Sequence, residues 1–119
     1  MSGFADREPV LAVAFYRTTT GNEPVREWLR SRTREDQRIV GTRIRVTQYN
    51  WPSGMSLVRK LGPHLWEVRC GLEDGIARVL FTVDHGVMVL LHAFVKKTQK
   101  TPARDLMIAR ERLYRLRQE

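Results

Sequence analysis

The sequence has very little cysteine: Cys70 is the only one among 119 residues. An internal disulfide and a cysteine-based zinc site are therefore excluded. No run of about 18 apolar residues is present, which excludes a helix long enough to cross a bilayer. Residues 1–9 are polar and lack the apolar stretch of a signal peptide. We therefore expect a cytoplasmic protein with no membrane association.

Metal-ligand and hydrolase signatures are absent as well. No spacing of His, Asp and Glu is typical of a metal site, and no Ser-His-Asp grouping is readable. We therefore expect neither a metal ion nor another cofactor.

The sequence also contains no internal repeat, low-complexity tract or linker. Its hydrophobic residues amount to 42% and its charged residues to 29%, a composition typical of globular proteins. Domains mostly contain about 100–150 residues. We expect a single domain over residues 1–119, with residues 1–9 as a flexible tail.

Acidic residues are scarce relative to basic ones. Asp and Glu total 13 against 21 Lys and Arg, which gives a formal net charge of +8. Half of this surplus lies in residues 87–104, a stretch without an acidic residue that contains Lys96, Lys97, Lys100 and Arg104. Such a surplus indicates an anionic partner, namely nucleic acid, an acidic protein or a membrane surface. For the local run alone, a solvated basic loop is the alternative.

Hydrophobic periodicity predicts an α+β domain with the element order β-α-α-β-β-β-α. Alternating apolar residues predict strands over 10–16, 65–70, 76–83 and 87–96. Helical spacing predicts helices over 24–31, 34–48 and from 102 onward. Thr33 followed by Asp36 resembles a capping box at the second helix. Thr101-Pro102 predicts the start of the last helix, with the threonine as its N-cap.

Alternation along the strands predicts two different sheet faces. One face is wholly apolar and includes Val87, Val89 and Leu91, and we expect the helices to cover it. The other face is mixed, and its polar members are charged side chains and His92.

Strand register predicts a row of basic side chains on the mixed face. A three-residue loop at 84–86 places Arg78 opposite His92. Matching the apolar faces of the preceding hairpin places Arg69 opposite Arg78, and Lys96 lies further along the same face.

Two arginines opposite each other destabilise a sheet, because like charges repel. An anion between them reverses the sign, since guanidinium groups bind phosphate through two hydrogen bonds. We therefore interpret Arg69 and Arg78 as a phosphate site. In the alternative interpretation, Glu67 neutralises one arginine and the other basic groups extend into water.

Three segments of the second half carry a family pattern. They read LGPHLWEVR at 61–69, ARVLF at 77–81 and LHAFVKKTQKTP at 91–102. The pattern resembles the RelE/HigB toxin superfamily and is most similar to its phage-derived HigB-like branch. The resemblance implies a RelE-like fold: a mostly antiparallel four-stranded sheet with helices packed on one face.

The resemblance also implies a function and partners. The protein would be the toxin of a type II toxin–antitoxin system, a metal-independent endoribonuclease that cleaves messenger RNA on the ribosome and inhibits translation. Its partners would be a cognate antitoxin, usually a helix-turn-helix DNA-binding protein, and mRNA on the ribosome. Operator DNA would be reached only through the antitoxin. Two alternatives are a non-catalytic basic RNA- or DNA-binding module and a catalytically inactive toxin homologue.

Cleavage of RNA through its own 2′-hydroxyl needs a base, a group that stabilises phosphorane charge, and an acid for the 5′-oxygen. The resemblance carries over to Arg69, to Arg78 and to either Lys96 or Lys97. The arginines suit charge stabilisation because they stay protonated. His92 titrates near neutrality and suits the acid or the base, unless it is an interior histidine. A lysine becomes the proton donor if neighbouring cations lower its pKa; otherwise both lysines hold phosphates.

Four further residues complete the predicted RNA-binding surface: Lys60, Phe94, Lys100 and Arg104. Phe94 either stacks on a base or packs beside Ile76. Lys100 and Arg104 lie at the positive end of the last helix and would reinforce a phosphate site.

Overall fold

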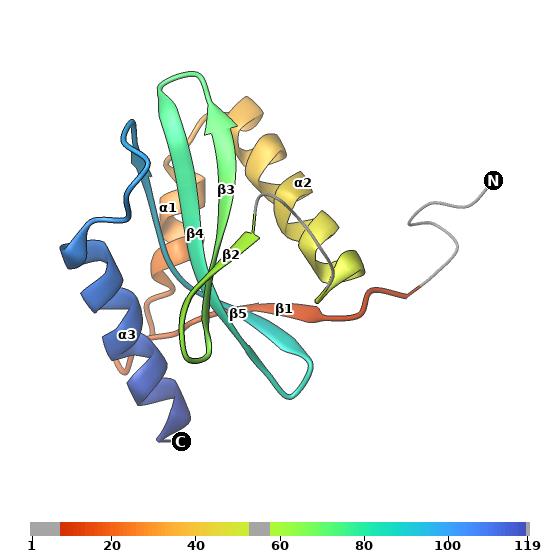
Figure 1. The fold of residues 1–119 in the computed structure, drawn as a ribbon, viewed down its shortest axis with the longest axis vertical. Coiled ribbons are helices and arrows are strands. Elements are labelled where there is room, and N and C mark those ends of the chain that lie inside the picture. Colours follow the sequence, from red (N-terminus) through yellow and green to blue (C-terminus); the bar gives the residue numbers. More distant parts are fainter. Residues whose placement is uncertain (1–7, 53–57, 119) are drawn as a thin grey trace.

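The computed structural model describes residues 8–52 and 58–118 (Figure 1). Most of the predicted N-terminal tail, residues 1–7, lies outside this range. Within it, the helices and strands follow in the order β1 (Ala12–Phe15), α1 (Pro24–Arg30), α2 (Arg34–Asn50), β2 (Val58–Gly62), β3 (Leu65–Leu72), β4 (Gly75–Asp84), β5 (Val87–Lys96) and α3 (Ala103–Arg117).

The strands form one mixed sheet in the order β1-β5-β4-β3-β2. β1 is parallel to β5, and the other neighbours are antiparallel. The α+β class is confirmed, but the prediction of four strands is wrong because the described residues contain a fifth. β2 was missed because it is a five-residue edge strand whose sequence, VRKLG, has no apolar alternation.

Helices cover both faces of the sheet, so the prediction that they pack on one face is wrong. α1 and α2 contribute Val25, Val40 and Ile44 to a core with β3, β4 and β5. α3 contributes Ala109 and Leu113 to a second core on the opposite face. The second face can hold a helix because it is more apolar than strict alternation predicts.

The extra apolar surface comes from a shift in register between β4 and β5. Arg78 lies opposite Phe94, not opposite His92 as predicted, and His92 lies opposite Leu80. The register changes between the partners of Leu80 and Phe81, where β5 carries one extra residue.

The turn before β5 also differs from the prediction. Asp84 pairs with Val87, which leaves a two-residue connection instead of three. Both connecting residues, His85 and Gly86, have positive φ, as tight hairpin turns require. The combined shift places Val89 and Leu91 in the α3 core. Met88 and Leu90 join the α1/α2 core instead.

The starts of the two longer helices differ in their capping. Thr33 caps α2 as predicted, because its hydroxyl accepts a hydrogen bond from the Asp36 backbone N–H at 3.1 Å. Thr101 does not cap α3: the N-cap is Pro102, which makes no side-chain hydrogen bond there. The Thr101 hydroxyl instead donates to the Glu67 carboxylate, at 2.5 Å. The Thr101 hydroxyl thus binds the buried Glu67 carboxylate of β3 and does not bind a backbone N–H at the start of α3.

Candidate nucleic-acid interface

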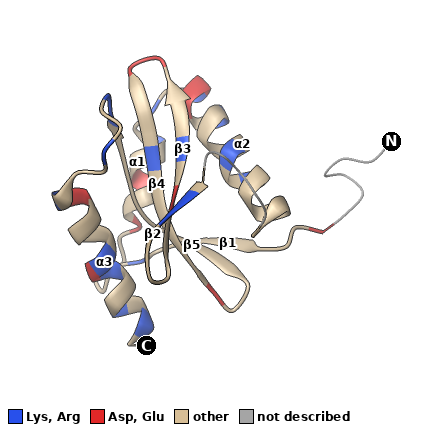
Figure 2. Cartoon of the chain, viewed as in Figure 1, with Lys and Arg blue, Asp and Glu red and all other residues tan. Residues whose placement is uncertain are grey.

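Two arginines lie side by side on the face that α3 covers. Arg69 of β3 is directly opposite Arg78 of β4, so this part of the predicted register is confirmed. Figure 2 shows basic segments in blue on β3, β4 and the edge strand β2. The Arg78 side chain is fully buried, whereas 23% of the Arg69 side chain is exposed.

A buried carboxylate organises this region. Glu67 has no exposed surface. Its Oε1 lies 3.2 Å from Nε of Arg69 and 3.7 Å from Nε of Arg59. Its Oε2 lies 3.9 Å from Nη1 of Arg78 and accepts the hydrogen bond from the Thr101 hydroxyl. We call Arg59, Arg69 and Arg78 around this carboxylate the arginine cluster.

The segment between β5 and α3 folds over the arginine cluster. Arg78 donates from Nη2 to the Thr98 carbonyl and from Nη1 to the Thr101 hydroxyl, at 3.4 Å for the latter. Arg69 donates to both the side-chain and the backbone oxygen of Gln99, each at 3.1 Å. Nε of Arg78 is buried and has no hydrogen-bond partner among residues 8–52 and 58–118. The segment therefore supplies oxygens to two guanidinium groups and leaves one buried donor unsatisfied.

Charge in the arginine cluster is unbalanced. Three guanidinium groups surround one carboxylate, so the surplus is positive. Burial lowers the pKa of Arg78; the Glu67 carboxylate opposes this shift, and the neighbouring Arg69 and Arg59 reinforce it. Arginine nevertheless remains protonated in proteins. The cluster is therefore chemically suited to hold an anion.

His92 lies on the same face and is held by residues of α3. Its Nε2 is 2.7 Å from Oδ1 of Asp105, and its Nδ1 is 3.5 Å from Nη1 of Arg112. This network assigns the proton to Nε2 and the lone pair to Nδ1. Arg112 also donates to the Leu91 carbonyl at 2.7 Å. The ring stacks on Phe94, with centroids 5.5 Å apart.

Burial lowers the pKa of His92, and the hydrogen bond that the ring donates to Asp105 opposes this shift. The unfolded chain therefore takes up the proton more readily than the folded protein does, and stability should fall as the pH drops below about 6.5. The cations Arg112 and Arg104 contribute in the same direction. We expect Asp105→Asn to enlarge the loss, since it removes the group that raises the pKa.

This prediction is checked by urea unfolding at about pH 8 and about pH 5. His92→Gln serves as the reference, so that titration of other groups cancels in the difference. The wild type should lose more stability on acidification than His92→Gln, and Asp105→Asn more than the wild type. Equal losses in all three proteins would contradict the assignment.

The structure places the remaining predicted site residues in three ways. Phe94 is 9% exposed and packs in the α3 core beside Arg78. Four basic residues are exposed at the end of β5, on the segment that follows it and on the first turn of α3: Lys96, Lys97, Lys100 and Arg104. Lys60 is separated from them, because its Nζ lies over the Trp66 ring, which belongs to the opposite core.

Sequence reasoning missed Arg59. This residue lies directly opposite Glu67 on the edge strand β2. Without a predicted β2 no pairing with β3 was available, and the adjacent Lys60 was selected instead. Because neighbouring residues of a strand point to opposite faces, the two side chains belong to different sides of the sheet.

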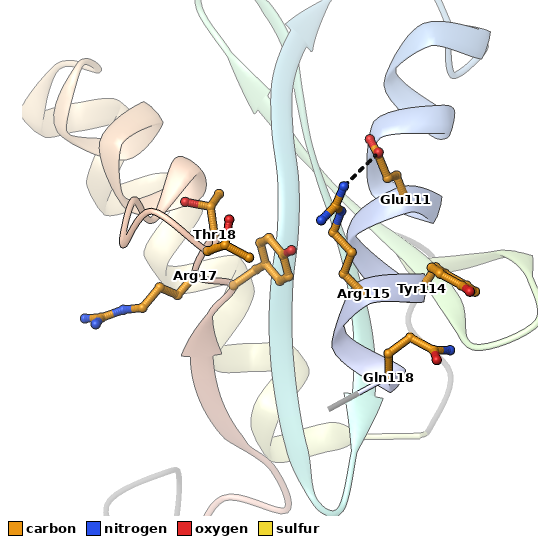
Figure 3. A pocket seen from close by; sticks show the side chains of 8 residues that line it. Arg17, Thr18, Glu111, Tyr114, Arg115 and Gln118 are labelled. Carbon is orange, nitrogen blue, oxygen red and sulfur yellow. Dashed lines mark ion pairs between the residues drawn. The ribbon is translucent and has the colours of Figure 1, made fainter.

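A groove of about 700 Å³ lies apart from the arginine cluster (Figure 3). It separates the segment that follows β1 from the C-terminal half of α3 and is lined by Tyr16, Arg17, Thr18, Thr19, Glu111, Tyr114, Arg115 and Gln118. Arg115 pairs with Glu111 across 3.6 Å. No predicted site residue lines this groove.

The described part of the chain contains no reactive cysteine, no group of metal-ligating side chains and no membrane-spanning helix. Burial raises the pKa of the Cys70 thiol to about 12, so it is not a nucleophile near neutral pH. Among residues 8–52 and 58–118, no three His, Cys, Asp or Glu side chains are grouped to hold a metal ion. No helix in these ranges is long and apolar enough to span a membrane.

The fold and the site define an α+β domain with a basic cluster on one sheet face. The family model for phage-derived Gp49-like proteins (DUF891) matches residues 27–114, a range that contains every predicted site residue. The chain therefore belongs to the Gp49-like family, a RelE/HigB-type toxin family associated with toxin–antitoxin systems. Toxins of this family typically pair with an antitoxin. No curated protein matches the chain.

Proposed function

We propose that this protein is the toxin of a type II toxin–antitoxin pair of the HigB-like branch, and that it cleaves messenger RNA on the ribosome. The observation that carries this proposal is the arginine cluster with its positive surplus, which donates to residues 98, 99 and 101. The exposed Lys96, Lys97 and Lys100 are close to these residues in sequence. Membership in a RelE/HigB-type family supplies the biological context. The partners are a helix-turn-helix antitoxin and ribosome-bound mRNA, in the cytoplasm.

In the proposed reaction, the 2′-oxygen attacks the adjacent phosphorus and loses its proton. The bond from phosphorus to the 5′-oxygen breaks, and the 5′-oxygen takes up a proton, leaving a 2′,3′-cyclic phosphate. Arg69 and Arg78 stabilise the charge that develops on the phosphorane oxygens. Their fixed positive charge serves the transition state without a proton transfer of their own.

Two groups remain candidates for the proton transfers. Neutral His92 accepts a proton at Nδ1, and the resulting imidazolium is stabilised by Asp105 at 2.7 Å from Nε2. Lys96 at the end of β5, or the exposed Lys97 that follows it, protonates the leaving oxygen. The arrangement needs no metal ion, because each required role is filled by a side chain.

Expression of the protein without its antitoxin tests the proposal. We expect growth arrest, and primer extension should then map cleavage of messages at positions in register with codons. Arg38→Ala is a matched control: it removes an exposed arginine, paired with Glu35 at 2.7 Å on α2, on the other side of the sheet. This variant should arrest growth as the wild type does. Normal growth with abundant folded wild type would overturn the proposal.

A non-catalytic RNA-binding module is the second candidate. It is favoured by the burial of Arg78 and by the contacts that both nitrogens of His92 already make. Under this alternative, expression arrests growth while messages stay intact, and the purified protein binds an oligoribonucleotide without cleaving mRNA on ribosomes. Salt dependence does not separate the candidates, since both neutralise phosphate charge.

A further inference from the structure

Glu67 has more positive partners than its own burial requires. Removing a carboxylate from water costs several kcal/mol, and a well-placed cation with good hydrogen bonds compensates that cost. Here three guanidinium groups surround the carboxylate, and the Thr101 hydroxyl donates to it as well. A salt bridge that serves only the fold does not explain the surplus of positive charge or the buried, unsatisfied Nε of Arg78.

Glu67 accepts a hydrogen bond from Nε of Arg69, so the two Nη atoms of Arg69 can donate to other acceptors. The carboxylate meets Arg69 through Nε, at 3.2 Å. Both Nη atoms of Arg69 are therefore directed to other acceptors, the two oxygens of Gln99. Arg78 likewise gives Nη2 to the Thr98 carbonyl. The outer nitrogens of both arginines thus donate to oxygens of the segment between β5 and α3.

Glu67 itself is unsuited to touch RNA. Its side chain is fully buried, and its two oxygens are already divided among Arg59, Arg69, Arg78 and Thr101. A base in the reaction must come within hydrogen-bond reach of the 2′-hydroxyl. Any effect of Glu67 on the reaction must therefore pass through the arginines that it holds.

We propose that Glu67 is a positioning residue: its buried carboxylate fixes the orientation in which Arg69 and Arg78 present their Nη groups to a phosphate of the RNA. This inference rests on the proposed function. The geometry supports it, because the carboxylate holds Nε of Arg69 and lies near Nη1 of Arg78, while the remaining donors are directed toward the segment 98–101. Phosphate would displace the oxygens of that segment.

The test is Glu67→Gln, which keeps the size of the side chain and removes its charge. We expect kcat for mRNA cleavage on ribosomes to fall on the order of 10- to 100-fold, since small misplacements of catalytic groups have effects of this size. KM should stay unchanged or fall, because the cluster gains net positive charge. A merely structural role would lower the melting temperature and leave kcat per folded molecule unchanged, which would overturn the inference.

Two matched variants separate orientation from charge. Glu35→Gln makes the same chemical change at an exposed carboxylate of α2 and should leave kcat unchanged. Glu67→Gln combined with Arg59→Gln restores the net charge of the cluster without restoring the held orientation. We expect this double variant to remain impaired. Recovery of the wild-type kcat would show that net charge, not orientation, is what Glu67 supplies.

A second readout keeps this inference separable from the proposed function. If the wild type fails to cleave mRNA, the proposed function fails, and nuclear magnetic resonance of the arginine Nε–H groups still decides the role of Glu67. In the wild type, the Arg69 and Arg78 signals should be resolved and should shift when a short oligoribonucleotide is added. In Glu67→Gln they should approach the signals of exposed arginines. Identical signals in both proteins would overturn the inference.

Discussion

Replacing Arg69 with alanine is expected to lower the rate of mRNA cleavage on ribosomes by roughly 100- to 1,000-fold, the usual effect of removing one donor that stabilises transition-state charge. Arg69 is the partly exposed member of the central pair, with 23% of its side chain accessible. Its two Nη atoms donate to the side-chain and backbone oxygens of Gln99, which a phosphate would have to replace.

The fold should tolerate the Arg69 substitution. Glu67 keeps Arg59 and the Thr101 hydroxyl as partners, so its buried charge remains paired. We expect the free energy of unfolding to fall by no more than about 2 kcal/mol. Single-turnover cleavage of a defined message, measured beside urea unfolding, separates the two effects.

Arg69→Lys refines this test. Lysine keeps the positive charge but loses the planar fork that binds two phosphate oxygens at once. Its cleavage rate should lie between those of the wild type and Arg69→Ala, whereas Arg38→Ala should cleave at the wild-type rate. Wild-type cleavage by Arg69→Ala would remove this residue from the site.

The β3–β4 hairpin could be predicted from the sequence because its register has a strong physical cause. Val68 and Val79 lie opposite each other in a core, and Arg69 and Arg78 lie opposite each other on the other face. A slip of one residue would place charged side chains of one strand on the core face of the other. Apolar alternation on both strands therefore determines the pairing.

The β4–β5 pairing lacked this constraint. Residues 87–91 read VMVLL and are apolar at every position, so alternation does not distinguish the two faces. Both registers bury apolar side chains, and the tight turn at His85 and Gly86 and the later shift decide between them. The position of His92 opposite Leu80, and not opposite Arg78, follows from that shift and could not be read from spacing.

The composition of the arginine cluster was only partly predictable for a similar reason. Glu67 and Arg69 are two residues apart on one strand, so their shared face follows from strand geometry alone. Arg59 enters through β2, whose sequence carries no strand signal. Thr101 belongs to the cluster because the chain between β5 and α3 folds back over the sheet. Its hydroxyl therefore donates to the Glu67 carboxylate and does not cap α3.

Replacing Arg78 should have the largest effect on stability. Two variants of this residue separate its effect on stability from its effect on RNA cleavage. Arg78→Ala leaves a cavity beside Phe94 and removes the donor from the Thr98 carbonyl. We expect it to lower the free energy of unfolding by about 3–5 kcal/mol, as loss of one member of a buried ion pair does. Arg78→Met fills most of the same volume without charge. It avoids the cavity, and Glu67 keeps Arg59, Arg69 and the Thr101 hydroxyl as partners, so we expect a smaller loss of stability than for Arg78→Ala.

The comparison of these two variants decides why a fully buried arginine occupies this position. If Arg78 acts on RNA phosphate, Arg78→Met should be more stable than Arg78→Ala and still lose cleavage by roughly 100-fold or more. The guanidinium group would then be required for the reaction, and not only for the packing of the side chain beside Phe94. If Arg78→Met cleaves as the wild type does, Arg78 supports the sheet only, and the charge on the phosphorane must be stabilised by Arg69 and the exposed lysines.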